Sequence, residues 1–377
     1  MGNYINNRLQ LFPIAKFSIE TIDRMKTRKT KTIVIQISLA VILLLLVIGC
    51  GSSAQEIITA NPRVLPTKNP SGLSGEASAT LSSLEKLDEY PFYVMHFKGA
   101  YSYPNIRAYL ANPGGFGCSL FASLGMQGDN LYGRNFDWEY SPAMLLFTDP
   151  PDGYASASMV DLTFVGIDVE KSKLLLDNPL ENRIGLLDAP SMPFDGMNEY
   201  GLVIGMAALP DQYIDDASYD SSRMTIGSIG IIRQVLDHAK NVDEAVEIFK
   251  QYNIDFSGGP PIHYLLADRN GKASLIEFSQ GEMVVLPNEN TWHLATNHLR
   301  YTSADDGGCW RYRTLRENLT AQNGVLDTSS AMQLLSQVKQ DITQWSVVYD
   351  MTSGDIHVVL AGDYDNSYRF HLDLSQP

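Results

Sequence analysis

Residues 112–121, NPGGFGCSLF, place a cysteine directly behind a run of glycines, and the segment GRNFDW follows at 133–138. The second segment adds Arg134 and Asp137 to Cys118. A thiolate is a strong nucleophile, and a cysteine in such a setting can act as a reagent. These residue types indicate nucleophilic chemistry at Cys118. The alternative is a small buried hydrophobic residue beside a plain surface ion pair.

Two routes activate such a thiol. The first is a histidine oriented by a third group. None of the seven histidines stands in a recognisable local signature, but the sequence does not rule any of them out. A cysteine peptidase that uses one of them therefore stays an alternative. The second needs no histidine. Cleavage of the Gly117–Cys118 bond gives Cys118 an α-amino group, with a pKa of about 7.7–8.0, that accepts the thiol proton. We expect the glycines to supply the φ > 0 or strained geometry that self-cleavage needs.

A wider stretch, GCSLFASLGMQGDNLYGRNFDW at 117–138, resembles the nucleophile strand and hairpin of the choloylglycine hydrolase superfamily. This superfamily comprises N-terminal-nucleophile hydrolases of linear amides, among them bile salt hydrolases, penicillin V acylases and acid-ceramidase-like amidases. Further similar segments are DGMNEYGL (195–202), LADRNGKASLIEF (266–278), LATNH (294–298) and RYRTLRENL (311–319). The resemblance therefore covers about residues 118–377, in the same order.

The resemblance implies roles for three residues of the hairpin. Cys118 is the nucleophile, with its own amine as general base, and no metal or cofactor is needed. Arg134 lowers the pKa of the thiol and helps to orient the substrate. Asp137 holds the amine of Cys118 through a charge-assisted hydrogen bond.

The resemblance also implies that Asn297 donates its amide N–H to the oxyanion and that Arg311 supports the site. Arg313 is an alternative to Arg311 because the Arg-Tyr-Arg step aligns either way. One departure concerns the strand that follows the Asn-Glu-x-Gly-Leu turn. Bile salt hydrolases and penicillin V acylases end it in an asparagine, whereas this chain has Ala207 and Ala208. A backbone N–H must then replace that donor or turnover is weaker, and a surface binding protein with a degenerate site stays an alternative.

The elements that must position these residues follow from hydrophobic patterning. Short apolar runs punctuated by Gly, Asp and Pro predict strands up to residue 208. Residues 226–252 have helical spacing, with Asn241 and Asp243 as a break and N-cap. A hairpin is predicted over 262–278, helices over 309–321 and 329–338, and three closing strands after residue 344. Together with the resemblance, this predicts an α+β fold: the αββα four-layer sandwich, with two mostly antiparallel sheets between helix layers.

The first residues have the pattern of an export signal. Basic residues after Met25, the expected start, precede an apolar run at 33–48 and then Cys50. The run is shorter than the roughly 20 residues that span a bilayer, and it suits a signal-peptide core. The box ending at Cys50 resembles that of bacterial lipoproteins, in which the cysteine carries the lipid. We expect a lipid-anchored protein on the extracytoplasmic face of a bacterial membrane, with an uncleaved signal anchor as the alternative.

Domain boundaries follow from changes in composition. Residues 1–49 form the signal or hydrophobic segment, and the Ser-, Pro- and Gly-rich residues 50–83 are expected to be a flexible tether. Residues 84–117 form a prosegment. Its aromatic stretch 90–103 predicts a strand or a strand pair, which we expect to stay docked after cleavage. The catalytic domain spans residues 118–377.

Composition excludes some functions. The formal net charge of −15 argues against a nucleic-acid partner, which requires a basic face. Three cysteines form no disulfide framework, and Cys309 is expected to be a structural residue at a helix start. The expected partner is a small-molecule N-acyl amide with an apolar acyl group, hydrolysed by water or passed to an amine if the protein is an acyltransferase. The sequence predicts no oligomeric state.

Overall fold

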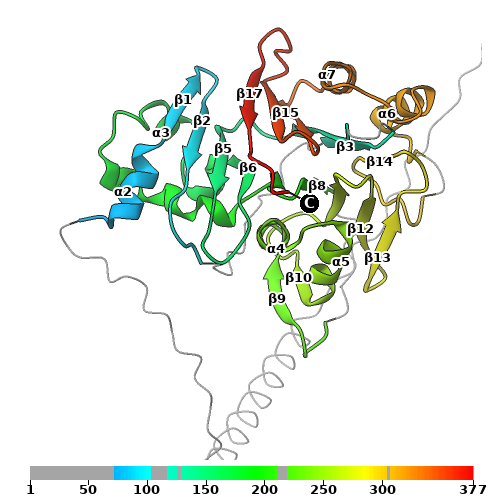
Figure 1. Cartoon of the computed structure of the whole chain (residues 1–377), viewed down its shortest axis with the longest axis horizontal. Coiled ribbons are helices and arrows are strands. Elements are labelled where there is room, and N and C mark those ends of the chain that lie inside the picture. The colour runs from blue at the N-terminus through cyan, green and yellow to red at the C-terminus, as the bar shows by residue number, and fades with distance from the viewer. Residues whose placement is uncertain (1–71, 103–116, 126–128, 211–218, 304–305, 377) are drawn as a thin grey trace, which may run out of the picture. The chain divides into compact units, whose positions relative to one another are not determined.

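The computed structural model describes residues 72–102, 117–125, 129–210, 219–303 and 306–376, which belong to one compact unit (Figure 1). The expected signal segment, Cys50, most of the tether and the glycines before residue 117 lie outside the described residues. Among the described helices, none is long and apolar enough to cross a membrane.

A six-stranded antiparallel sheet carries the predicted nucleophile. Its strand order is β14 (Trp292–Ala295), β3 (Gly117–Ser123), β4 (Leu131–Asp137), β15 (Thr343–Asp350), β16 (Asp355–Leu360) and β17 (Tyr368–His371). Every residue of β3 and β4 is buried, because both faces of these central strands are covered. The polar residues of these strands, among them Arg134, Asn135 and Asp137, are therefore buried as well.

The second sheet has nine strands. Its order is β1 (Glu85–Asp88), β2 (Phe92–His96), β5 (Ala143–Thr148), β6 (Ser156–Asp161), β7 (Asp195–Asn198), β8 (Leu202–Ala208), β11 (Ile262–Asp268), β12 (Ala273–Ser279) and β13 (Glu282–Pro287). All pairs are antiparallel except β2 with β5. The predicted hairpin over 262–278 is confirmed as β11 and β12.

The two sheets pack face to face, and apolar side chains from both of them form the core between them. Gly205 on β8 lies at a close approach between the sheets, since a side-chain carbon there would sit 2.7 Å from the hydroxyl of Tyr132 on β4. That hydroxyl also donates to the carbonyl of Leu265 on β11. A glycine at this position therefore allows the sheets to close on each other.

Helices cover both outer faces. α6 (Trp310–Ala321) packs on β3 and β14, and α7 (Thr328–Gln337) packs on β4 and β15, as Figure 1 shows. α4 (Gly230–His238) and α5 (Val242–Lys250) cover β7, β8, β11 and β12. Asn241 caps α5 as predicted, accepting from the N–H of Glu244. The layers are thus helix, sheet, sheet, helix, and the predicted αββα architecture is confirmed.

The remaining elements lie around this framework. They are α2 (Gly75–Ser82), the 3-10 helices η1 (Leu162–Val165) and η2 (Leu180–Ser191), α3 (Val169–Lys173), and a parallel pair formed by β9 (Met224–Gly227) and β10 (Tyr252–Asp255). β9 and β10 flank the predicted helical region 226–252, whose ends are therefore extended.

The N-terminal part differs from expectation in two ways. Part of the stretch expected to be a flexible tether is helical, since α2 lies within it. Ser74 caps the first turn of α2, and the helix packs on η2. The strand expected over 90–103 is limited to β2, and β1, which was not predicted, pairs with it. Phe92, Tyr93 and Met95 of β2 are fully buried. This segment is thus built into the nine-stranded sheet.

Candidate active site

The β3–β4 hairpin assembles the predicted nucleophile and two of its partners. Cys118 is 2 % exposed, and pairing with β4 sets Gly117 opposite Asp137 and Leu120 opposite Arg134. Because side chains alternate along a strand, the thiol and Arg134 share the face toward the second sheet, and the carboxylate of Asp137 lies on the helix-covered face. The Gly117–Cys118 bond is thus flanked by functional groups on both faces of the sheet.

Arg134 is fully buried beside the thiol. Its guanidinium forms an ion pair with Asp195 of β7 and donates to the carbonyl of Phe194 at 2.6 Å. Burial raises the pKa of the Cys118 thiol, and the positive charge of Arg134 opposes that rise. Asp195 begins the DGMNEYGL segment, but sequence reasoning gave it no role, since its contact with Arg134 arises only when the two sheets pack.

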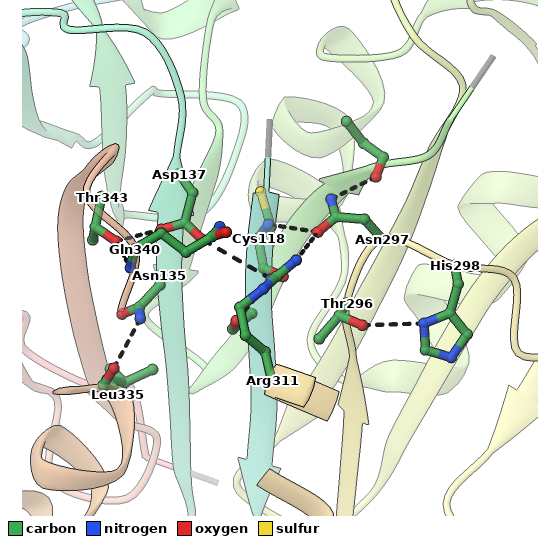
Figure 2. A network of polar contacts seen from close by, with 12 residues as sticks. Cys118, Asn135, Asp137, Thr296, Asn297, His298, Arg311, Leu335, Gln340 and Thr343 are labelled. Atoms are coloured by element: carbon green, nitrogen blue, oxygen red, sulfur yellow. Dashed lines mark hydrogen bonds and ion pairs between the residues drawn. The ribbon is translucent and has the colours of Figure 1, made fainter. Parts of the chain in front are cut away.

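Asn297, just after β14, binds the backbone of the nucleophile. Its Oδ1 accepts from the N–H of Cys118 at 2.8 Å, and its Nδ2 donates to the carbonyl of Ala208 at 2.7 Å (Figure 2). A carboxamide has two N–H donors, so one remains for a substrate oxygen. Ala208, whose side chain lacks the donor found in relatives, thus contributes through its backbone by orienting Asn297.

The structure separates the two candidate arginines of α6. Arg311 is 7 % exposed, donates to the carbonyl of Cys118, and holds Asn297 Oδ1 through a 2.9 Å hydrogen bond. It also lies 3.9 Å from a carboxylate oxygen of Asp137. Arg313 is half-exposed and pairs with Asp306 instead. Arg311 is therefore the one placed in the site.

Two residues after α7 fix the carboxylate of Asp137. Gln340 Nε2 donates to Asp137 Oδ2 at 2.6 Å, and the hydroxyl of Thr343 donates to Oδ1 (Figure 2). Burial raises the pKa of Asp137, although these hydrogen bonds and the charges of Arg311 and Arg134 oppose the rise. Sequence reasoning missed Gln340 and Thr343, because a glutamine and a threonine in a turn carry no recognisable signal.

A small apolar pocket adjoins the thiol. The residues lining it are Cys118, Arg134, Phe136, Trp138, Phe194, Met206, Ala208, Pro260 and Ile262. Its volume of about 10 Å³ is close to that of one water-sized sphere. Among the described residues, no group of three or more His, Cys, Asp or Glu side chains is arranged to hold a metal ion.

A buried histidine–glutamate pair supports the loop that carries Asn297. The ring nitrogens of His263 on β11 lie 3.0 Å from Glu277 Oε1 and 2.6 Å from the carbonyl oxygen of Thr296. The ring of His263 thus links β12 to the backbone just before Asn297. Burial raises the pKa of Glu277, but hydrogen bonds from His263 and from the N–H groups of Arg300 and Tyr301 outweigh it, and the pKa is lowered. Sequence reasoning missed this pair.

His298 makes the same loop sensitive to acid. Its Nε2 is buried without a hydrogen-bond partner among the described residues, and burial lowers its pKa to about 4. The pKa of a histidine in the unfolded chain is near 6.5. Between pH 4 and pH 6.5 the folded state therefore binds fewer protons than the unfolded state. Its contribution to stability is present above about pH 6.5 and is lost as pH falls toward 4, by at most about 1.4 kcal/mol per pH unit.

We therefore expect His298→Gln to lose less stability on acidification than the parent chain. Urea unfolding at pH 7.5, 6 and 5 measures this difference. Both proteins should carry Cys118→Ala, so that each unfolds as one chain. Equal pH slopes for the two proteins would contradict the assignment of the acid sensitivity to His298.

The structure thus gathers Asn297, Arg311 and Asp137 around the start of β3, while the thiol of Cys118 faces Arg134 between the two sheets. Residues 118–370 match the family model described as linear amide C-N hydrolases, choloylglycine hydrolase family. The chain belongs to this family, and the resemblance seen in the sequence is confirmed.

Similar solved structures are enzymes of this kind. A conjugated bile acid hydrolase from Clostridium perfringens is 18 % identical, with a TM-score of 0.49 over 68 % of this chain and 92 % of that one. Penicillin V acylase from Agrobacterium tumefaciens is 15 % identical, with a TM-score of 0.47 over 69 % and 88 %. An uncharacterized protein of Paramecium bursaria Chlorella virus 1 is 32 % identical over 101 residues, or 25 % of this chain and 36 % of that relative. This chain thus spans about a third of the length of that curated relative.

Proposed function

We propose that this chain cuts itself between Gly117 and Cys118 and then hydrolyses N-acyl amides with Cys118 as its N-terminal nucleophile. The observation that carries the proposal is the polar surrounding of the Cys118 backbone. Its N–H donates to Asn297 Oδ1, and Arg311 binds both that oxygen and the Cys118 carbonyl. A new amine would be held there within reach of its own thiol. The family match, which begins at the same residue, also supports the proposal.

Self-cleavage starts when the sulfur of Cys118 attacks the carbonyl carbon of Gly117. The carbon–nitrogen bond breaks as the thioester forms, and the thiol proton passes to the released amine. Water then hydrolyses the thioester to the Gly117 carboxylate and the free thiol. In each later turnover the α-amine takes the thiol proton and the sulfur accepts the acyl group. The leaving amine is protonated, and water releases the acid.

The substrate follows from the surroundings of the sulfur. The pocket walls are mainly aromatic and aliphatic, among them Phe136, Phe194 and Ile262, and they favour an apolar acyl group. Because the pocket is so small in the uncut chain, we infer that it widens in the mature enzyme. The remaining N–H of Asn297 supplies a donor to the oxyanion, and Arg134 stabilises the thiolate. An amine acceptor in place of water would make the protein an acyltransferase.

The N-terminal segment stays bound after the cut, in this proposal. β2 lies between β1 and β5, and the Tyr101 hydroxyl lies 2.9 Å from both carboxylate oxygens of Asp237. The export signal pattern ending at Cys50 leads us to propose further that a lipid on Cys50, or an uncleaved signal anchor, holds the protein on the outer face of a bacterial membrane.

Intact-mass measurement of the purified protein under denaturing conditions tests the proposal. We expect one fragment that begins at Cys118 and a second that ends at Gly117, eluting together under native conditions. A panel of chromogenic N-acyl amides, with and without an added amine, then measures hydrolysis against acyl transfer. A wholly uncut chain that still hydrolyses the panel would contradict the N-terminal nucleophile. A catalytic chain washed from membranes without detergent would contradict the docked segment.

A further inference from the structure

Gly117, the residue before the nucleophile, lies directly against the end of the Gln340 side chain. A side-chain carbon on Gly117 would lie 2.1 Å from Gln340 Nε2 and 3.2 Å from Asp137 Oδ2. The backbone at Gly117 is regular strand and does not occupy the left-handed region. Our expectation of φ > 0 is therefore wrong for this glycine. A larger residue here would instead have to displace the end of the Gln340 side chain.

The amide nitrogen of Gln340, which lies against Gly117, also orients the carboxylate of Asp137. Gln340 Nε2 donates to Asp137 Oδ2 at 2.6 Å. The backbone of Gln340 is fixed in turn, since its N–H donates to Thr343 Oγ1 at 2.8 Å and its carbonyl accepts from the N–H of Thr343 at 3.1 Å. Thr343 binds the other oxygen of Asp137. One short turn thus holds both carboxylate oxygens beside the Gly117–Cys118 bond (Figure 2).

We propose that Gln340 is a positioning residue for self-cleavage, which holds Asp137 at the bond to be cut, and that a glycine before the nucleophile leaves Gln340 in that position. This inference rests on the proposed self-cleavage. When the Gly117–Cys118 bond breaks, the thiol proton moves to the new amine, and the oriented carboxylate stabilises the resulting ammonium group. A methyl group at residue 117 would push the end of Gln340 off Asp137, because Gln340 is the movable partner of that close contact.

A side chain at residue 117 should affect only the self-cleavage step and not later turnover. Residue 117 leaves the nucleophile once the bond is cut, so a change there alters none of the residues of the mature catalytic chain. Gln340 and Asp137 remain in that chain. The structure therefore predicts that a substitution at residue 117 slows the cut and leaves later turnover unchanged, which general destabilisation of the fold would not do.

A double-mutant cycle on the full chain tests this inference. Misplacement of a reacting group by about 1 Å costs up to about 10²-fold in rate. We expect Gly117→Ala and Gln340→Ala each to slow the appearance of the Cys118 fragment by about 10- to 100-fold. The double variant should be no slower than Gln340→Ala alone, because the methyl group then has no amide to displace. Gln333→Ala, an exposed glutamine on α7, is the matched control and should mature at the parent rate.

The readouts are the rate of fragment formation by mass spectrometry and kcat and KM per mature chain. Fully matured Gly117→Ala should have the parent kcat and KM, and a lowered kcat would show that the substitution acts through folding and would overturn the inference. Strictly additive slowing in the double variant, or cutting of Gly117→Ala at the parent rate, would also overturn it while self-cleavage stands. A parent chain that never yields the Cys118 fragment would overturn self-cleavage itself, and the inference with it.

Discussion

Replacing Cys118 by alanine should leave the chain uncut and abolish amide hydrolysis, because both reactions use the same sulfur. We expect a loss of at least about 10⁴-fold in kcat/KM, since removal of a nucleophile leaves only binding and oxyanion stabilisation. The fold should persist, because the side chain is small and alanine fits a central buried strand. Intact mass reports the missing cut, and a chromogenic N-acyl amide reports the missing activity.

Cys309→Ala is the matched control for that experiment. Cys309 precedes α6, makes no side-chain capping bond and packs in the core cluster on the helix side of the sheet, apart from the thiol of Cys118. This variant should mature and hydrolyse at rates close to those of the parent chain. If Cys118→Ala were cut normally and still hydrolysed the amide, the proposed mechanism would be wrong.

Replacing Asn297 by alanine should lower kcat by about 10²- to 10³-fold, the usual effect of removing one oxyanion donor. The substitution also removes the acceptor that binds the N–H of Cys118 and Arg311. KM should change little, because the donor acts mainly on the charge that develops in the transition state. Steady-state kinetics per mature chain separates these two parameters.

Asn297→Asp distinguishes the two roles of this side chain. An ionised aspartate keeps acceptor oxygens for Cys118 and Arg311 but has no N–H to donate. We expect its kcat to be as low as that of the alanine variant. Asn318→Ala, which removes only a bond to the carbonyl of Thr314 within α6, should be nearly silent. Parent-like turnover by Asn297→Asp would show that the donor is another group.

Much of the fold could be predicted from the sequence, because local patterns dictate it. The β11–β12 hairpin, the α4–α5 pair with its cap at Asn241, and α6 and α7 all follow from periodicity and capping residues. The parallel pairing of β2 with β5 and the strand β1 were not predicted, since they depend on contacts between distant parts of the chain. α2 was missed because its composition of small polar residues also fits a tether.

Some residues of the candidate site could likewise be predicted from the sequence, and others could not. Cys118, Arg134 and Asp137 lie on one hairpin, so their spacing alone brings them together. Asn297 and Arg311 came from the resemblance to a family, and the structure places both at the backbone of Cys118. Gln340, Asp195 and the His263–Glu277 pair were not predicted, because ordinary residue types acquire these contacts only when strands and sheets assemble.

The position of β2 within the nine-stranded sheet has a consequence for how the protein is made. If the chain is cut as proposed, the information for folding is complete only before the cut, when both parts belong to one polymer. A matured protein that unfolds would have to refold as two separate molecules, so recovery would depend on concentration and on the order of events. Its lifetime would then be set by the rate of unfolding rather than by an equilibrium, and each molecule would have a single opportunity to fold as one chain.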